Sequence, residues 1–164
     1  MQNTQIDPQN HEQQLAYELV ANTNSSFFLT GRAGTGKTTF LHNVQKLAGK
    51  QFITLAPTGV AAILAGGDTI HSFFGLPMEV CTSGTWGKMN EAKILTLLHA
   101  DTIIIDEAHR VAGQSSDVAR HKLGTMLAKA SPHLLLLTAT PHSGKTEPFM
   151  RLMRLLDEEA FPNT

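Results

Sequence analysis

The segment from Gly31 to Thr38 constrains this chain more than any other, because few folds can contain it. It reads GRAGTGKT, a glycine followed by four free positions and then Gly-Lys-Thr, which is the Walker A pattern of phosphate-binding loops. Such a loop wraps a polyphosphate with backbone N–H groups, and glycines remove Cβ atoms that would obstruct this. It must then open into a helix whose N-terminus favours an anion. The segment therefore predicts a nucleotide site between a strand and a helix.

The residues on either side of this loop supply both elements. Residues 27–30 form a short apolar run, which is typical of a buried strand. After the loop, apolar residues recur at helical spacing from Phe40 to Ala48, and Gly49 can end that helix. We expect Lys37 to bind the β- and γ-phosphates of ATP and Thr38 to hold Mg²⁺. The other expected nucleotide contacts are glycines and hydroxyls of the same segment: Gly31, Gly34, Thr35, Gly36 and Thr39.

A second pattern, TIIIDE at residues 102–107, completes the expected site. The β-branched run is typical of a buried parallel strand, and its two carboxylates fall at the carboxyl end, the usual ligand edge of an α/β sheet. Asp106 is expected to hold Mg²⁺ together with Thr38, while Glu107 polarises the attacking water. An Asp-Glu pair after a strand is weak by itself, but after a Walker A loop it indicates a Walker B pattern.

Composition limits the class of protein. At 164 residues the chain has the length of one domain, and 41% hydrophobic with 16% charged residues is typical of a globular protein. The net charge of −1 gives no general attraction to nucleic acid, so DNA binding would need local groups. Cys81 is the single cysteine, which excludes an internal disulfide. Without an apolar signal or membrane-spanning run, a soluble cytoplasmic protein is expected.

The N-terminal residues predict a helix with Asp7 as its cap and Pro8 at its first position. Gln13 and Gln14 on this helix lie just upstream of the phosphate loop, where an amide could read adenine through a donor and an acceptor. A solvated helix face is the alternative for both amides. The apolar stripe of the helix would consist of Leu15, Ala16, Leu19 and Val20.

Two segments after the loop helix carry residues that could contact DNA. A strand at 52–55 leads into a short helix of small residues, and Thr58 lies where its N-terminus could hold a phosphate. Further along, His71 is followed by Phe73 and Phe74. Aromatic rings can stack on nucleic-acid bases, although such pairs belong more often to the core.

The last third of the chain predicts a strand at 134–137 that ends in the hydroxyls of Thr138 and Thr140, which could sense the γ-phosphate. Helices are expected over 91–99, 118–130 and 147–157. The first of them is expected to be buried through Ile94, Leu95, Leu97 and Leu98, and the last to carry Arg151 and Arg154 on a solvated face.

One segment imitates a second phosphate loop. Ser143 to Thr146 reads SGKT, but Ala139 stands where the pattern requires its first glycine, and Pro141 stiffens the turn. We interpret it as a loop that leads into the last helix. The histidines show no metal-ligand spacing, so no zinc site is proposed for His109, His121, His133 or His142.

From about residue 13 to residue 107 the chain resembles superfamily 1 DNA helicases of the Pif/RecD-like group. FLTGRAGTGKT matches their motif I, APTGVAA their motif Ia, and TIHSFFG the DNA-contacting motif that follows. This resemblance implies that Gln14 (or Gln13) contacts adenine. It also implies that the DNA backbone is held at Thr58 and Gly59 and that residues 71–74, with His71 and Phe73, line a single-strand path.

Beyond Asp106-Glu107 the sequence no longer matches the motifs of that group. DEAHR and, later, HLLLLTATPHSGK resemble superfamily 2 translocases of the DEAH-box Swi/Snf type, over about residues 102–161. This second resemblance implies that His109, Thr138 and Thr140 couple hydrolysis to movement on DNA, which would then be double-stranded. The chain thus looks like a composite of the two superfamilies, with a seam near residues 102–110.

Both resemblances imply the same α/β fold, a RecA-like P-loop NTPase core with a parallel sheet between two helix layers. In that core the strand at 134–138 lies between those at 27–30 and 102–106, with 52–56 outside. The implied function is the first motor domain of an ATP-dependent DNA helicase or translocase, formed by residues 1–164 as a single domain. Hydrolysis would need a second RecA-like domain to supply an arginine finger, so the chain alone is expected to be weak or inactive.

Two other classes of function are compatible with a phosphate loop. A small P-loop nucleotide kinase would need an acceptor pocket and a cluster of lid arginines, and no such cluster is present in the sequence. A truncated or recombined fragment without catalysis is the other alternative. If the two parts were not matched to each other, core mismatches would cost about 1–3 kcal/mol at each site.

Overall fold

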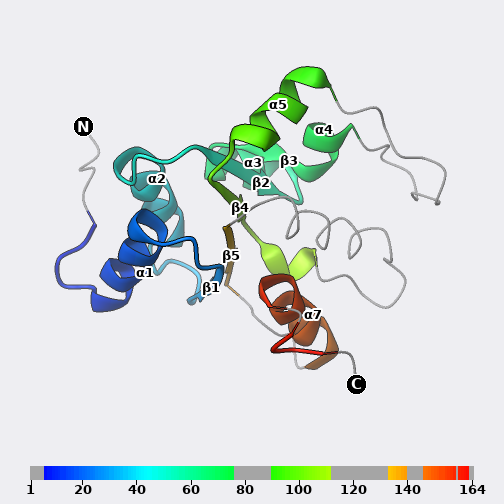
Figure 1. The fold of residues 1–164 in the computed structure, drawn as a ribbon. Helices are drawn as coiled ribbons and strands as arrows, with labels where there is room; N and C mark the ends of the chain where they lie inside the picture. The colour runs from blue at the N-terminus through cyan, green and yellow to red at the C-terminus, as the bar shows by residue number, and fades with distance from the viewer. Residues whose placement is uncertain (1–5, 76–89, 112–132, 140–145, 158, 163–164) are drawn as a thin grey trace.

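The computed structural model describes residues 6–75, 90–111, 133–139, 146–157 and 159–162. Its centre is a parallel five-stranded sheet in the order β1-β5-β4-β2-β3 (Figure 1). The strands are β1 (Phe27–Thr30), β2 (Phe52–Ala56), β3 (Asp68–Thr69), β4 (Thr102–Ile105) and β5 (Leu134–Thr138). The predicted order is confirmed, with β5 between β1 and β4 and with β2 outside β4. The short strand β3, which extends the sheet beyond β2, was not predicted.

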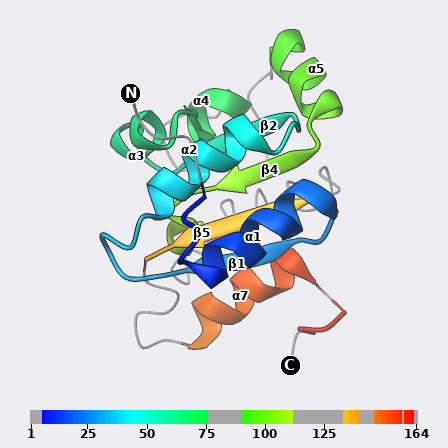
Figure 2. The same ribbon diagram turned by 90° about the vertical axis from the view of Figure 1, so that its left-hand side faces the viewer.

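Helices cover both faces of the sheet, which gives the expected three-layer α/β architecture (Figure 2). One face carries α1 (His11–Asn22), α2 (Lys37–Leu47) and α3 (Gly59–Ala65), and the other carries α4 (Ile70–Phe74), α5 (Glu91–His99) and α7 (Thr146–Leu156). A short 3₁₀ turn, η1 (Ala108–Arg110), follows β4. Among the described residues, no helix is long and apolar enough to span a membrane.

The core follows from the alternation of side chains along the central strands. In β4, Ile103 and Ile105 point into the cluster under α4 and α7, whereas Ile104 points into the cluster under α1 and α2. Leu134 and Leu135 of β5 divide between the two clusters in the same way. All four residues of β4 and all five of β5 are buried, as expected for the centre of a parallel sheet.

Helix α1 begins later than the sequence predicts. Its cap is Asn10, whose side chain accepts a hydrogen bond from the Gln13 backbone N–H, while Asp7 forms a separate turn by accepting one from Gln9. The prediction of Asp7 as cap and Pro8 at the first helical position is therefore wrong. Asp and Asn cap equally well, so residue type alone did not distinguish the two starts. Leu15 is also 57% exposed and does not belong to the buried stripe.

Helix α5 forms where predicted, but it is not a buried helix. None of its residues is buried, and Ile94, Leu95 and Leu98 are exposed, Leu98 to 74%. Only Leu97 and the following Ala100 pack, partly buried, against the core. The helix is held to the domain by Lys93, whose ammonium lies 3.3 Å from an Asp68 carboxylate oxygen and 3.0 Å from the Ser72 carbonyl. Apolar periodicity predicted the helix correctly but not the neighbours available to cover it.

Helix α7 packs Leu152, Met153 and Leu155 into the core. The prediction that Arg154 lies on a solvated face is wrong, because only 11% of its side chain is exposed. Its guanidinium donates to the Phe161 and Pro162 carbonyls and holds the C-terminal segment against the helix. The predicted helix over 118–130, Thr140 and most of the SGKT segment lie outside the described residues.

Candidate nucleotide-binding site

The phosphate loop joins β1 to α2 in the predicted strand–loop–helix arrangement. Gly34 and Gly36 have φ values of 80° and 84°, in the left-handed region that other residues rarely adopt. Gly36 is also the residue that caps α2. A Cβ atom at Gly31 would lie 2.8 Å from the Thr35 hydroxyl oxygen, so a larger residue there would displace the Thr35 side chain. Backbone conformation thus explains Gly34 and Gly36, whereas the clearance for phosphate inferred from the sequence stays a prediction.

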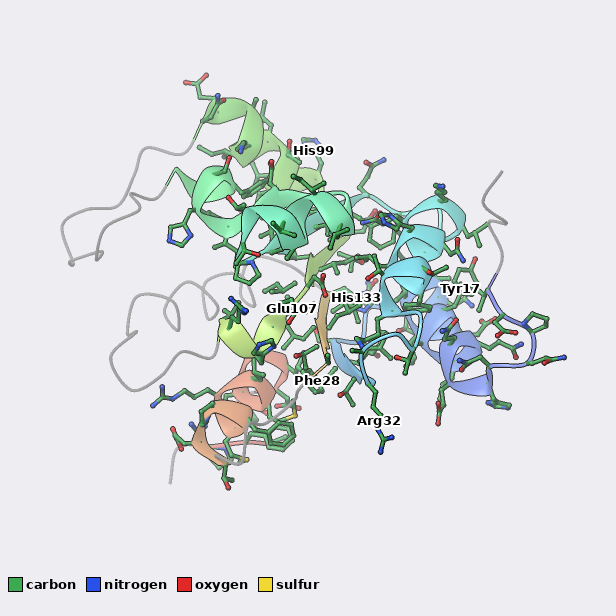
Figure 3. All side chains as sticks on the ribbon, turned by 180° about the vertical axis from the view of Figure 1, so that it is seen from behind. Tyr17, Phe28, Arg32, His99, Glu107 and His133 are labelled. Atoms are coloured by element: carbon green, nitrogen blue, oxygen red, sulfur yellow. The ribbon has the colours of Figure 1, made fainter. Side chains whose placement is uncertain are left out.

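Lys37 lies at the first position of α2, with its ammonium folded back into the loop. Its Nζ donates to the Gly31 carbonyl and, at 2.8 Å, to the Arg32 carbonyl. The Arg32 carbonyl also accepts from the backbone N–H and hydroxyl of Thr35, at 3.3 and 2.9 Å. These bonds give the loop a defined curve with a cation inside it. Thr38 and Thr39 are exposed on the first turn of α2, and the Arg32 side chain extends away from the domain (Figure 3).

Asp106 follows β4 at the carboxyl edge of the sheet, and its backbone N–H donates to the Leu55 carbonyl at 2.9 Å. Burial raises the pKa of Asp106 above its ordinary value, a shift that the Glu107 backbone hydrogen bond and the charge of Lys37 oppose. Both predicted Walker elements lie at the carboxyl edge of the parallel sheet, one after β1 and the other after β4. A bound cation would favour the ionised carboxylate further.

Thr38 and Asp106 fit a magnesium site of the P-loop type. Mg²⁺ is commonly held by one or two protein oxygens together with substrate phosphates and water. Such a site does not need a protein cage, and within the described ranges no three His, Cys, Asp or Glu side chains converge on one point. The available donors, one hydroxyl and one carboxylate, therefore match Mg²⁺ bound with a nucleotide.

Glu107 has an unusual backbone. With φ 51° and ψ 39° it lies in the left-handed region, alone among the non-glycine residues of the described segments. Conformations of this kind cost about 1–3 kcal/mol and occur often at functional sites. The turn caps η1 and follows β4 at the carboxyl edge of the parallel sheet, the edge at which the phosphate loop follows β1.

His109, on η1, connects Glu107 to the end of β5. Its Nδ1 lies 2.7 Å from the Thr138 hydroxyl oxygen and 3.2 Å from a Glu107 carboxylate oxygen. Thr138 is buried and pairs in register with Thr30, the last residue of β1 before the phosphate loop. The structure therefore brings together two of the three residues expected to couple hydrolysis to movement. No pattern in the sequence indicated the contact between His109 and Glu107.

The two candidate adenine amides are placed differently. A Cβ atom at Gly36 would lie 3.4 Å from the Gln13 Nε2, so this amide is next to the phosphate loop. The Gln14 amide instead donates to the Pro8 carbonyl at 2.8 Å. This placement favours Gln13, rather than Gln14, as the residue that would contact adenine. Gln13 shares a helix face with the buried residues Ala16 and Val20.

The residues expected to contact DNA follow β2 at the same sheet edge. Thr58 caps α3, and its hydroxyl accepts from the Ala61 backbone N–H at 3.3 Å, while the space around the Gly59 Cα is open. Phe73 is only 4% exposed and packs in the core, edge-to-face with Phe74. This burial favours the core interpretation of Phe73. His71, partly exposed on α4, remains available for a ligand.

The comparisons with known proteins agree with this geometry. The family model described as PIF1-like helicase matches residues 9–129, most of the chain. The chain belongs to the PIF1-like helicase family. The ATP-dependent DNA helicase Pif1 of Bdellovibrio bacteriovorus is 38% identical over 112 residues, which are 66% of this chain and 25% of that protein. This chain thus spans about a quarter of that relative's length.

A crystal structure of Pif1 helicase from Bacteroides in complex with ADP-AlF3 and ssDNA is similar, with a TM-score of 0.63 and 30% identity over 84% of this chain and 34% of that one. The RNA polymerase-associated protein RapA of Haemophilus influenzae is 33% identical over 97 residues, 57% of this chain and 10% of that protein. The residues matched by the family model, 9–129, include residues 102–110, where a seam was predicted.

Proposed function

We propose that this chain is the first motor domain of an ATP-dependent DNA helicase and that it binds ATP with Mg²⁺ at residues 31–38. The observation that carries the proposal is the glycine-shaped loop with Lys37 after β1, at the same carboxyl edge of the parallel sheet as Asp106 after β4. In this role Lys37 binds the β- and γ-phosphates, Thr38 and Asp106 hold Mg²⁺, and Gln13 contacts adenine. The Bacteroides helicase that shares the fold is in complex with ADP-AlF3.

Within the site, each residue has a distinct task. Magnesium, when bound, would neutralise charge on the phosphates and the leaving group. Lys37 and the N–H groups at the start of α2 stabilise the same negative charge from the protein side. Glu107, the residue after Asp106 at the carboxyl end of β4, orients the attacking water. Hydrolysis at a useful rate would need an arginine from a second motor domain, worth about 10³–10⁵ in rate.

The proposal is tested first by titrating a fluorescent ATP analogue against the 164-residue chain and its Lys37→Ala variant. Charged hydrogen bonds of this kind contribute about 1.5–3 kcal/mol, so we expect binding to weaken roughly 10- to 100-fold. Lys46→Ala is the matched control, since Lys46 is exposed at the far end of the same helix. Equal affinity of wild type and Lys37→Ala would exclude the phosphate-loop proposal.

DNA binding is proposed for the surface that carries Thr58, Gly59 and His71. The supporting observations are their position on elements that follow β2 and the ssDNA in the Bacteroides complex. His71→Ala should weaken binding of single-stranded DNA, whereas His99→Ala, an exposed histidine on α5, should not. Because Thr58 caps α3, it is best changed to Ser, which preserves the cap, alongside Ala, which removes it. A nucleotide kinase would bind ATP but show no DNA affinity that depends on His71.

The resemblance to RapA and the contact between His109 and Thr138 favour a second candidate, translocation on double-stranded DNA. The two candidates differ in ligand, so the same chain is titrated with single- and double-stranded oligonucleotides of one sequence. Preference for the duplex would favour the Swi/Snf-type proposal and the composite origin of the chain. Strong DNA-stimulated ATP turnover by the 164-residue chain alone would contradict the need for a second motor domain.

A further inference from the structure

Lys93, on the exposed helix α5, contacts residues 68–73 at three points. Its Nζ lies 3.3 Å from an Asp68 carboxylate oxygen in β3 and 3.0 Å from the Ser72 carbonyl oxygen in α4. It also lies over the Phe73 ring, 5.2 Å from the ring centre, which is within the range of cation–π attraction. A carboxylate, a carbonyl and an aromatic face together suit an ammonium group, which can only donate. One side chain therefore connects α5 to both β3 and α4.

The contacts of Lys93 fix the backbone on both sides of His71. Before it in the chain, Asp68 is paired with the lysine, and directly after it the Ser72 carbonyl accepts from the same ammonium. The Ser72 N–H donates to the Thr69 hydroxyl at 3.1 Å, so both backbone groups of Ser72 are hydrogen-bonded. Helix α4 has five residues, and a helix of that length is not stable by itself. Its orientation therefore depends on contacts such as those that Lys93 supplies.

The same contacts account for Phe73, whose ring was expected to line a single-strand path. The ring is 4% exposed and packs edge-to-face with Phe74, with the two centroids 5.0 Å apart. A nucleic-acid base that stacked on the face under Lys93 would have to displace the lysine. Phe73 thus supports Lys93, and the partly exposed His71 is the residue of the two that can meet DNA.

We propose that Lys93 is a positioning residue for DNA binding, because it holds residues 68–73 in the arrangement that presents His71 to a single strand. The lysine does not touch DNA in this role. Its charge is paired with Asp68 and only 29% of its side chain is exposed, so little of it is available to a phosphate. The role rests on the DNA binding proposed for His71, whereas the contacts of Lys93 do not depend on that proposal.

The test is a titration of single-stranded DNA against the 164-residue chain and its variants, at several salt concentrations. Lys93→Met keeps a long apolar side chain but removes the ammonium, and we expect affinity to fall about 3- to 10-fold. The salt dependence should not change, because a lysine that contacts no phosphate releases no counterion. Lys93→Arg can still pair with Asp68 and lie over Phe73, so its affinity should stay within about twofold of wild type. Lys46→Met, which removes the same charge from an exposed position on α2, is the matched control and should bind like wild type.

Equal affinity of wild type and Lys93→Met would overturn the proposal. So would a salt slope that is smaller by about 1 in Lys93→Met, since this marks a direct phosphate contact. Combined with His71→Ala, Lys93→Met should cause little further loss, because both changes act on one contact, and additive losses would contradict the positioning role. Asp68→Asn should give a smaller loss in the same direction, and it replaces Lys93→Met if circular dichroism shows that variant to be unfolded.

Hydrogen exchange separates this inference from the proposed function. In Lys93→Met the Ser72 amide should exchange faster than in wild type, whether or not DNA binds, because α4 has lost one of its supports. Unchanged exchange would show that Lys93 does not fix the segment. Failure of the wild-type chain to bind DNA would instead overturn the DNA surface proposed for His71, and with it the role that rests on that surface.

Discussion

The two edges of the sheet are built in opposite ways. At the amino edge, the residues that precede the strands are tied to one another. Asp101 accepts a hydrogen bond from the Gln51 backbone N–H at 2.8 Å, Ser26 accepts one from the Leu134 backbone N–H at 3.0 Å, and Lys50 donates to the Thr23 carbonyl at 2.7 Å. At the carboxyl edge, the chain leaves the strands in exposed loops with left-handed residues, including Glu107.

This difference separates stability from function. Hydrogen bonds between neighbouring segments fix the amino edge. The carboxyl edge keeps donors and charges available, in Lys37, Thr38 and Asp106, and it contains the strained backbone. Parallel α/β sheets generally bind ligands at this edge. Substitutions at the amino edge and among the packed strands should therefore change the free energy of unfolding most. Substitutions at the carboxyl edge should mainly change ligand binding.

The largest effect on stability is expected from Gly67→Ala, in the turn just before β3. A Cβ atom there would lie 2.1 Å from the Thr54 carbonyl oxygen and 2.7 Å from its carbon, both backbone atoms of β2. Neither can move away without disturbing the pairing of β2 with β3, so we expect a loss of about 3 kcal/mol or more in the free energy of unfolding. Urea denaturation measures the loss.

Gly59→Ala is the matched control for this prediction. Nothing lies within 4 Å of a Cβ atom at Gly59, which starts α3, and Ala is the better helix former. Its unfolding free energy should change by less than about 0.5 kcal/mol. Equal stability of the two variants would contradict the close approach of Gly67 to β2.

At the amino edge, His133 should make stability depend on pH. It is fully buried, with Nδ1 3.2 Å from the Thr102 hydroxyl, and burial together with the charge of Lys50 lowers the pKa of His133 to about 4. The unfolded chain has an ordinary histidine, with a pKa of about 6.5. The unfolded state therefore gains protons first as the pH falls. Neutral His133 therefore contributes about 2–3 kcal/mol to the free energy of unfolding. This contribution is fully present above about pH 6.5 and is lost by about pH 4.

His133→Asn isolates this contribution, because Asn can keep the hydrogen bond to Thr102 but does not titrate. Unfolding free energies of both proteins are measured between those two pH values. The wild type should lose more stability than the variant as the pH falls, and parallel curves would show that His133 titrates alike in both states.

Much of the fold could be predicted because it depends on short-range patterns. The apolar runs at 102–105 and 134–137, with a phosphate loop between a strand and a helix, specify a buried parallel sheet. Where predictions from the sequence were wrong, the missing information concerned tertiary contacts. The apolar stripe of α5 predicts a helix but not whether anything covers Leu98, and Arg154 owes its burial to the carbonyls of a segment that follows the helix.

In the candidate site, too, features that depend on local sequence were predicted and features that depend on tertiary contacts were not. Lys37 and Asp106 were predicted from motifs because loop geometry and strand ends are local properties. The choice between Gln13 and Gln14 depended on which helix face packs toward the loop, and the burial of Phe73 depended on the core under α4. The contact of His109 with Glu107 requires a left-handed turn in a glutamate, which no local preference predicts.

The smallest effect is expected at the carboxyl edge itself, from two substitutions of Glu107 that both remove the carboxylate. Glu107→Ala keeps a Cβ atom in the left-handed region, whereas Glu107→Gly adopts that region without steric cost. Gly also loses more chain entropy on folding, which offsets part of the gain. We expect Glu107→Gly to be more stable than Glu107→Ala by about 1 kcal/mol in urea denaturation. If Glu107→Ala were the more stable variant, the turn would not be strained, and the contrast between the two edges would rest on exposure alone.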